Sequence, residues 1–181
     1  VITRPGPHFA FGEVRPTGGD LELHRFEVRA TGTPTQTELS PEALDAQGWI
    51  THHVDALGQP AAVGADFRVR CKPEAIKADM VHLTYRVERR TATGYTPVED
   101  LQPWLGMDAH SVMIGAAGHT VGERIFRHLH AGHHDDHGKS SGAHILFMLH
   151  GEDVPPSGVY RVWLQVKRGG RVLTFPFTVS I

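Results

Sequence analysis

Apolar and polar residues alternate along most of the chain from residue 65 onward. In residues 81–88 the apolar positions Val81, Leu83, Tyr85 and Val87 recur at every second residue, so they share one face of an extended segment. Similar runs occupy residues 24–29, 66–71, 111–114, 124–130, 144–150, 160–166 and 172–179. A period of two residues is typical of half-buried β-strands, and these runs therefore predict a mainly β protein.

Turn-forming residues separate these runs at regular intervals. Pro155-Pro156-Ser157-Gly158 precedes the run at 160–166, and Gly169-Gly170 follows it. A Gly-Gly pair supplies the positive φ angles that tight hairpin turns require. About seven short strands with such turns predict an antiparallel β-sandwich of immunoglobulin-like or cupredoxin-like type.

The first part of the chain has a different character. Residues 1–63 are rich in Gly, Pro and Thr, and Ser40-Pro41 predicts the start of a short helix that ends near Gly48. We therefore expect an N-terminal extension or small lobe at 1–63 and a β-sandwich at 64–181. His52-His53 is an adjacent pair, and neighbours on a strand point to opposite faces, so a chelating role is not favoured.

Composition excludes several classes of protein. The formal net charge is −2, which argues against a nucleic-acid partner, and no apolar run is long enough to span a membrane. Cys71 is the only cysteine, so an internal disulfide and a Cys-x-x-Cys metal or redox motif are excluded. No nucleophile elbow, His-Glu-x-x-His helix or phosphate-binding loop is found, and we expect no enzymatic activity. By contrast, 14 of the 181 residues are histidine, which points toward metal binding.

Four sequence blocks in the second part occur in a fixed order. They are Asp100-Leu101-Gln102-Pro103-Trp104-Leu105-Gly106, then His110, then His128-Leu129-His130, and finally residues 156–165 with the sequence Pro-Ser-Gly-Val-Tyr-Arg-Val-Trp-Leu-Gln. With these blocks, residues 65–181 resemble a recurrent domain of bacterial secreted, periplasmic and membrane-tethered proteins linked to heavy-metal handling. That domain usually has a proline directly after its His-x-His, whereas here Ala131-Gly132 leads into a longer loop. The first 63 residues lie outside the resemblance.

His110, His128 and His130 are the leading candidates for metal ligands. His128 and His130 are two residues apart on a predicted strand, so both rings leave the same face with Cα atoms roughly 6.5–7 Å apart. His110 opens the preceding strand, and a hairpin register could place it beside the pair. Three neutral imidazoles without a thiolate suit copper or zinc. The competing interpretation is three separate histidines on unrelated strands.

Further candidates lie in and after the loop that follows this pair. His133, His134 and His137, with Asp135 and Asp136, form a His-rich tract that is either a capture arm for metal or a solvated hairpin tip.

The strand after this loop adds another face with potential ligands. In residues 144–150, His144 and Met148 share one face with His150, opposite a face of apolar residues predicted to be core. If that face lies beside the His128 strand, His144 and Met148 could complete the site.

The resemblance implies copper, as Cu(I) or Cu(II), and the thioethers of Met113 and Met148 are soft enough for Cu(I). The sequence therefore predicts a periplasmic or secreted metal-binding protein that stores, buffers or delivers copper to a membrane transporter or metalloenzyme. No signal peptide is present in this chain, so the location rests on the resemblance. Two alternatives remain open: a zinc-binding protein, and an immunoglobulin-like interaction module of a larger envelope assembly whose histidines are incidental.

Overall fold

The structure is a computed structural model that describes residues 5–14, 16–20, 22–33, 39–115, 125–131, 142 and 144–181. The chain divides into two compact units, residues 1–38 and residues 39–181. This division differs from the predicted boundary at residue 63, because residues 50–54 form a strand that pairs with residues 67–71 of the second unit. Of the predicted N-terminal extension, residues 39–63 thus belong to the larger unit.

The smaller unit contains an antiparallel pair of strands, β1 (Gly6–Val14) and β2 (Glu22–Ala30). Phe26 and Val28 lie on the same face of β2, and both are exposed. A two-stranded hairpin is only marginally stable by itself.

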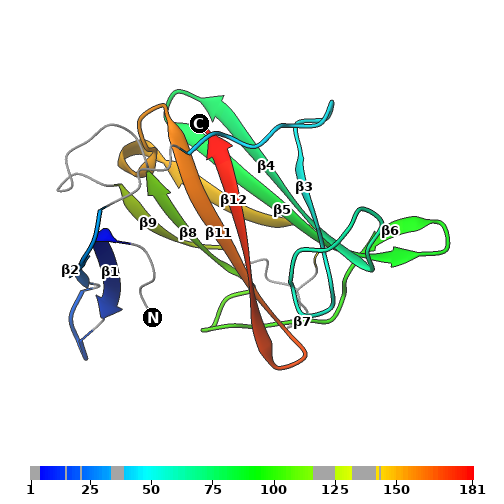
Figure 1. The fold of residues 1–181 in the computed structure, drawn as a ribbon, viewed down its shortest axis with the longest axis horizontal. Coiled ribbons are helices and arrows are strands. Elements are labelled where there is room, and N and C mark those ends of the chain that lie inside the picture. Colours follow the sequence, from blue (N-terminus) through cyan, green and yellow to red (C-terminus); the bar gives the residue numbers. More distant parts are fainter. Residues whose placement is uncertain are drawn as a thin grey trace. The chain divides into compact units, whose positions relative to one another are not determined.

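The larger unit is built from two antiparallel sheets (Figure 1). The first sheet has the order β10-β5-β4-β3, with β6 also paired to β5, and the second has the order β12-β11-β8-β9, with β7 also paired to β11. The strands of the first sheet are β3 (Ile50–Val54), β4 (Phe67–Lys77), β5 (Met80–Thr91), β6 (Gly94–Pro97) and β10 (Ile145–His150). Those of the second are β7 (Leu101–Gln102), β8 (His110–Gly115), β9 (Phe126–His130), β11 (Val159–Arg168) and β12 (Arg171–Ser180).

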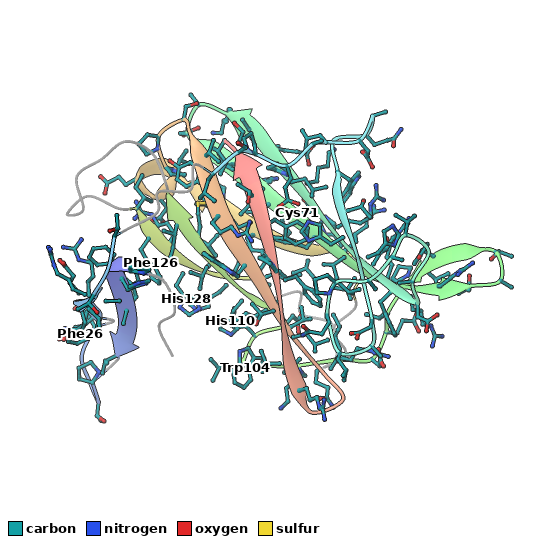
Figure 2. The ribbon with its side chains drawn as sticks, viewed as in Figure 1. Phe26, Cys71, Trp104, His110, Phe126 and His128 are labelled. Atoms are coloured by element: carbon teal, nitrogen blue, oxygen red, sulfur yellow. The ribbon has the colours of Figure 1, made fainter. Side chains whose placement is uncertain are left out.

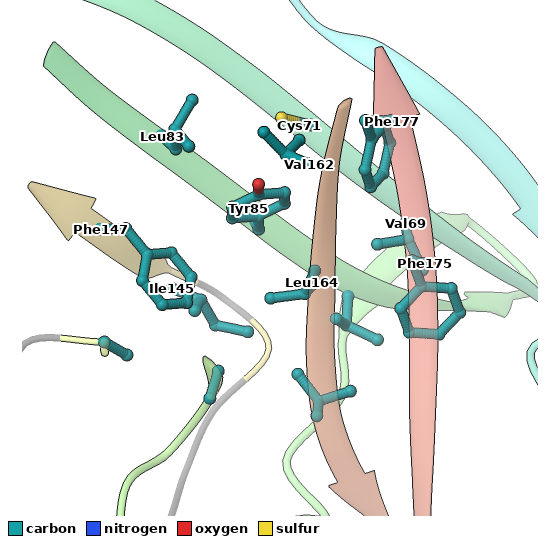
Figure 3. Packing of buried hydrophobic residues seen from close by; sticks show 14 of the residues in the cluster. Val69, Cys71, Leu83, Tyr85, Ile145, Phe147, Val162, Leu164, Phe175 and Phe177 are labelled. Carbon is teal, nitrogen blue, oxygen red and sulfur yellow. The ribbon is translucent and has the colours of Figure 1, made fainter. Parts of the chain in front are cut away.

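One hydrophobic core lies between the two sheets. The first sheet contributes Tyr85 and Phe147, whose rings meet edge to face at 5.7 Å, and the second contributes Leu164 and Phe177 (Figure 3). The alternating apolar positions of β5 and β10 are buried as predicted. Burial on one face of each sheet explains why the sequence alternates, and the prediction of a mainly β, antiparallel protein is confirmed.

The predicted helix after Ser40 is wrong. Residues 39–45 are not helical, and the backbone N–H of Glu42 donates to the carbonyl of Thr178 at 2.8 Å. The carboxylate of Glu42 in turn accepts the Thr178 N–H at 2.7 Å. The segment therefore covers the free edge of β12, and these cross-chain bonds replace the hydrogen bonds that a first helical turn would make.

Trp104 and Trp163 are not among the buried core residues. Trp163 pairs with Val112 on the outward face of the second sheet. Gly169 and Gly170 have φ values of 55° and 75° and form the predicted tight turn between β11 and β12. In the described part of the chain, no helix is long and apolar enough to cross a membrane.

Candidate metal centre

The pairing of β8 with β9 brings the three leading histidines together. His110 lies directly opposite His130, and Val112 lies opposite His128. Because paired residues share a face and residues two apart on one strand do too, all three rings project from the same side of the sheet. Ser111 and Met113 on β8 are fully buried, so the histidines lie on the side that faces away from the core.

The three imidazoles form a compact cluster, which we call the His triad. One nitrogen from each of His110, His128 and His130 lies within 4.8 Å of the other two. The ring centroids are 5.2 Å apart for His110 and His128, 5.0 Å for His110 and His130, and 4.7 Å for His128 and His130. Figure 2 shows His110 and His128 next to each other on this surface. The predicted convergence of these residues is thus present.

The position of His110 is fixed by the loop that contains Trp104. The Nε2 atom of His110 lies 2.8 Å from the carbonyl oxygen of Trp104, and its Nδ1 atom lies 3.1 Å from His128 Nε2. A carbonyl can only accept, so His110 Nε2 carries the proton and donates it. In the neutral ring, Nδ1 then has a lone pair, which accepts the His128 Nε2–H.

This arrangement is typical of a metal ligand. Metal-binding histidines commonly donate their other ring N–H to a backbone carbonyl, which fixes the tautomer and the ring orientation. The 3.1 Å separation of His110 Nδ1 and His128 Nε2 is close to the edge, about 3.3 Å, of a tetrahedron with metal–nitrogen bonds of about 2.0 Å. An ion could therefore take the place of the proton between the two rings.

The loop itself is tightly turned. The N–H of Trp104 donates to the Met107 carbonyl at 2.7 Å, and the Met107 N–H donates back to Trp104 at 3.1 Å. Leu105 and Gly106 between them have positive φ values of 50° and 80°. This turn directs the Trp104 carbonyl at His110. A backbone carbonyl has no signature of its own in a sequence, and the Pro-Trp-Leu-Gly turn is the available signal for it.

Burial decreases across the His triad. His110 is only 3% exposed, His128 is half-buried and His130 is exposed. The described residues within ligand distance of one another at this point are imidazoles alone, with no carboxylate or thiolate. The cluster therefore offers neutral nitrogen donors, is held in place at the buried His110 and is open to solvent at His130.

The other predicted ligands have different outcomes. His133, His134 and His137 lie outside the described residues, as do Asp135 and Asp136. Before them in the chain, the N–H of Ala131 donates to the Ala109 carbonyl at 3.1 Å. After them, the carbonyl of Gly142 accepts the Val87 N–H at 2.8 Å.

His144 and Met148 do not join the His triad. They could complete the site only if β10 lay beside β9, the strand of His128. In the structure β10 pairs instead with β5, in the other sheet. Ile145, Phe147 and Leu149 point into the core, so Met148 points outward from the first sheet and is 48% exposed. The core separates it from the triad. His144 precedes β10 and is exposed.

Cys71 lies in the core on β4 and is fully buried, as expected for a small apolar side chain. Burial raises the pKa of its thiol, which keeps the thiol protonated and makes it a poor ligand. It is not part of the His triad. A blue-copper centre, which needs a thiolate beside two imidazoles, has no such thiolate at this site.

Comparison with known proteins identifies the family. Residues 61–181 match a domain of unknown function (DUF8832). The chain belongs to this family. The match begins close to the start of the region that carries the resemblance described above.

Among solved structures, the chain is similar to the crystal structure of a DUF4848 family protein from Bacteroides thetaiotaomicron VPI-5482. The identity is 12%, the TM-score is 0.34, and the match covers 88% of this chain but only 56% of that one. No curated protein matches the chain. These findings do not address metal handling, so the resemblance to heavy-metal domains stays a prediction.

Proposed function

We propose that this domain binds one metal ion through the His triad and that the ion is copper. The observation that carries the proposal is the convergence of three imidazole nitrogens within 4.8 Å on the outward face of the second sheet. Chance placement of exposed histidines does not explain why the ring of His110 is buried and held by a backbone carbonyl at 2.8 Å. Histidines oriented in this way are pre-organised to bind metal.

The chemistry of the donors favours copper over the hard cations. Imidazole suits copper and zinc, whereas calcium and magnesium require oxygen ligands. Copper is also favoured by the Irving–Williams order and by the resemblance to heavy-metal domains. Three protein ligands leave a coordination position open for exchange with a donor or an acceptor. These points support storage, buffering or delivery of copper in the periplasm or outside the cell, and zinc is the alternative ion.

The proposal is tested by loading the full chain with Cu(II), Cu(I) or Zn(II), removing loose metal by desalting, and measuring bound metal by elemental analysis. In the protein loaded with Cu(II), we expect about one copper ion per chain, which a His128→Ala/His130→Ala variant fails to retain. A His24→Ala/His144→Ala variant removes two exposed histidines elsewhere and is the matched control. Equal retention in the two variants would show that the triad does not hold the metal.

A second candidate function is supported by the smaller unit. Phe26 is 60% exposed and Val28 is 45% exposed on one face of the β1–β2 hairpin. An exposed apolar face on a marginally stable hairpin favours a docking role, as in an interaction module. Binding of metal by the larger unit and docking by the smaller one are compatible. A Phe26→Ser/Val28→Ser variant with unchanged copper retention would separate the two functions.

A further inference from the structure

The outward face of the first sheet carries a second set of soft ligands. In the pairing of β5 with β10, His82 lies opposite Met148, and Met80 lies opposite His150. The neighbouring core positions Val81 and Leu149 are buried, so these four side chains share the outward face. We call them the Met/His square.

The spacing within the square is set by the sheet. Residues directly opposite each other on antiparallel strands have Cβ atoms roughly 4.5–5.5 Å apart. Residues two apart on one strand are separated by roughly 6.5–7 Å. Methionine has three rotatable side-chain bonds, and Met148 and His150 are exposed. The thioethers and imidazoles can therefore turn toward one ion without a movement of the backbone.

One atom in the square lacks a partner. The Nε2 atom of His82 is buried and makes no hydrogen bond with any described residue. A buried polar atom without a partner costs about 1–3 kcal/mol and calls for an explanation, such as an ion. Met148 on one side of His82 offers a thioether, which is a weak acceptor but a good soft ligand.

Two carboxylates near the square each have a lysine neighbour. Glu74 lies opposite His82 on β4, and its oxygen is 2.7 Å from the ammonium of Lys72. Asp79, next to Met80, is 3.2 Å from the ammonium of Lys77. The four residues of the square itself supply two thioether sulfurs and two imidazoles, and no oxygen. Such a donor set favours a soft monovalent cation over a hard divalent one.

We propose that Met80, His82, Met148 and His150 form a second metal site, selective for a soft monovalent ion of the Cu(I) and Ag(I) type. It is independent of the His triad, because the two sites lie on the outward faces of different sheets with the core between them. The triad offers nitrogen donors alone and accepts copper in either oxidation state, whereas two thioethers make the square specific for the reduced ion.

Silver nitrate in chloride-free buffer is the probe, because Ag(I) has the same charge and softness as Cu(I) and does not change oxidation state. The titration uses the full chain with His128→Ala/His130→Ala, so that the triad does not contribute. The readout is the NMR signal of each methionine methyl group. We expect the methyl signals of Met80 and Met148 to shift to saturation near one equivalent, while that of the buried Met113 stays in place.

Substitution gives the second test. Leucine has nearly the volume of methionine but no sulfur, so a Met80→Leu/Met148→Leu variant should fold and bind Ag(I) at least tenfold more weakly. Met113→Leu is the matched control and should bind as before. The proposal is overturned if the Met80 and Met148 signals do not move, or if the leucine variant binds as well as the control.

The two proposals fail separately. Loss of Cu(II) in the triad variant with silver still bound at the methionines would support both sites. Silver binding without any loss of Cu(II) in the triad variant would overturn the His triad alone.

Discussion

Two pairs of histidines in this protein differ by one residue of spacing, and as a result one pair shares a face of its sheet while the other is divided between the two faces. His128 and His130 are two apart on β9, and their rings lie 4.7 Å from each other on one face. His52 and His53 are adjacent on β3 and are divided between the two faces. His52 stacks on the core residue Phe177 at 4.4 Å, and His53 lies near Tyr95 on the outside.

The comparison shows how strand geometry sorts the same residue type into different roles. His52 bonds to the carboxylate of Glu42, the residue that also holds the Thr178 backbone, so this imidazole fastens residues 39–45 to the sheet edge. His128 is instead joined to another imidazole. The contacts of His52 are with groups that stabilise the fold, whereas His128 is one of the three imidazoles that we propose as metal ligands.

The largest expected effect comes from changing the spacing without changing the number of histidines. A Leu129→His/His130→Leu variant gives β9 an adjacent pair like that of β3 and turns one ring toward the core. We expect its copper affinity to fall on the order of 100-fold, because one imidazole leaves the shared face. Competition with a chelator of known affinity measures the change.

The control for the spacing change is His130→Leu alone, which loses the same ligand and keeps Leu129. Both variants should bind copper with the same affinity, well below that of the unchanged protein. Circular dichroism establishes that each is folded, since Leu129 packs against the core. Full affinity in the rearranged variant would contradict the importance of spacing.

The next effect concerns the support of His110. Gly106 has a φ of 80°, and a Gly106→Ala substitution strains the turn that directs the Trp104 carbonyl at His110. We expect the copper affinity to fall by roughly 10-fold, within the range found when the hydrogen-bond partner of a ligand is disturbed. Gly94→Ala imposes comparable strain at a φ of 134° in the β5–β6 turn and should leave the affinity unchanged.

A smaller effect is expected at the pair His52 and His53, where a substitution should change the stability of the fold and not the binding of metal. His52→Ala removes the bond to Glu42 and the contact with Phe177, which should lower the free energy of unfolding by about 1–3 kcal/mol. Copper retention should not change. Denaturant unfolding of the metal-free chain measures the loss, and His130→Ala, an exposed residue, should cost less than His52→Ala.

The smallest effect is a dependence on pH. Burial and the nearby charge of Arg68 lower the pKa of His53 below its usual 6.5. The unfolded chain then binds a proton more readily than the folded one, so His53 reduces stability as the pH falls below about 6.5. His53→Gln should flatten the loss of melting temperature between pH 7 and 5. His24→Gln changes an exposed histidine and should leave the loss of melting temperature between pH 7 and 5 the same as in the unchanged protein.

The local pattern of apolar and polar residues was sufficient to predict most of the strands and the face on which His128 and His130 lie. Alternation in residues 81–88 and 144–150 identified the strands and their buried faces, because the side-chain period of a strand is a local property. The spacing of His128 and His130 likewise placed two imidazoles on one face. The helix expected after Ser40 failed because its N-cap signal was weaker than the bonds between Glu42 and Thr178, which are 136 residues apart in the chain.

What the sequence determined by itself was therefore a mainly β chain and a pair of imidazoles that share a face. Only the tertiary structure decided which third residue meets them, because strand register depends on contacts between distant segments. That register placed His110 opposite His130 and put Met148 opposite His82 instead of beside the triad. It also supplied the Trp104 carbonyl, a backbone group whose role no residue type reveals and which becomes a partner of His110 through the shape of its turn.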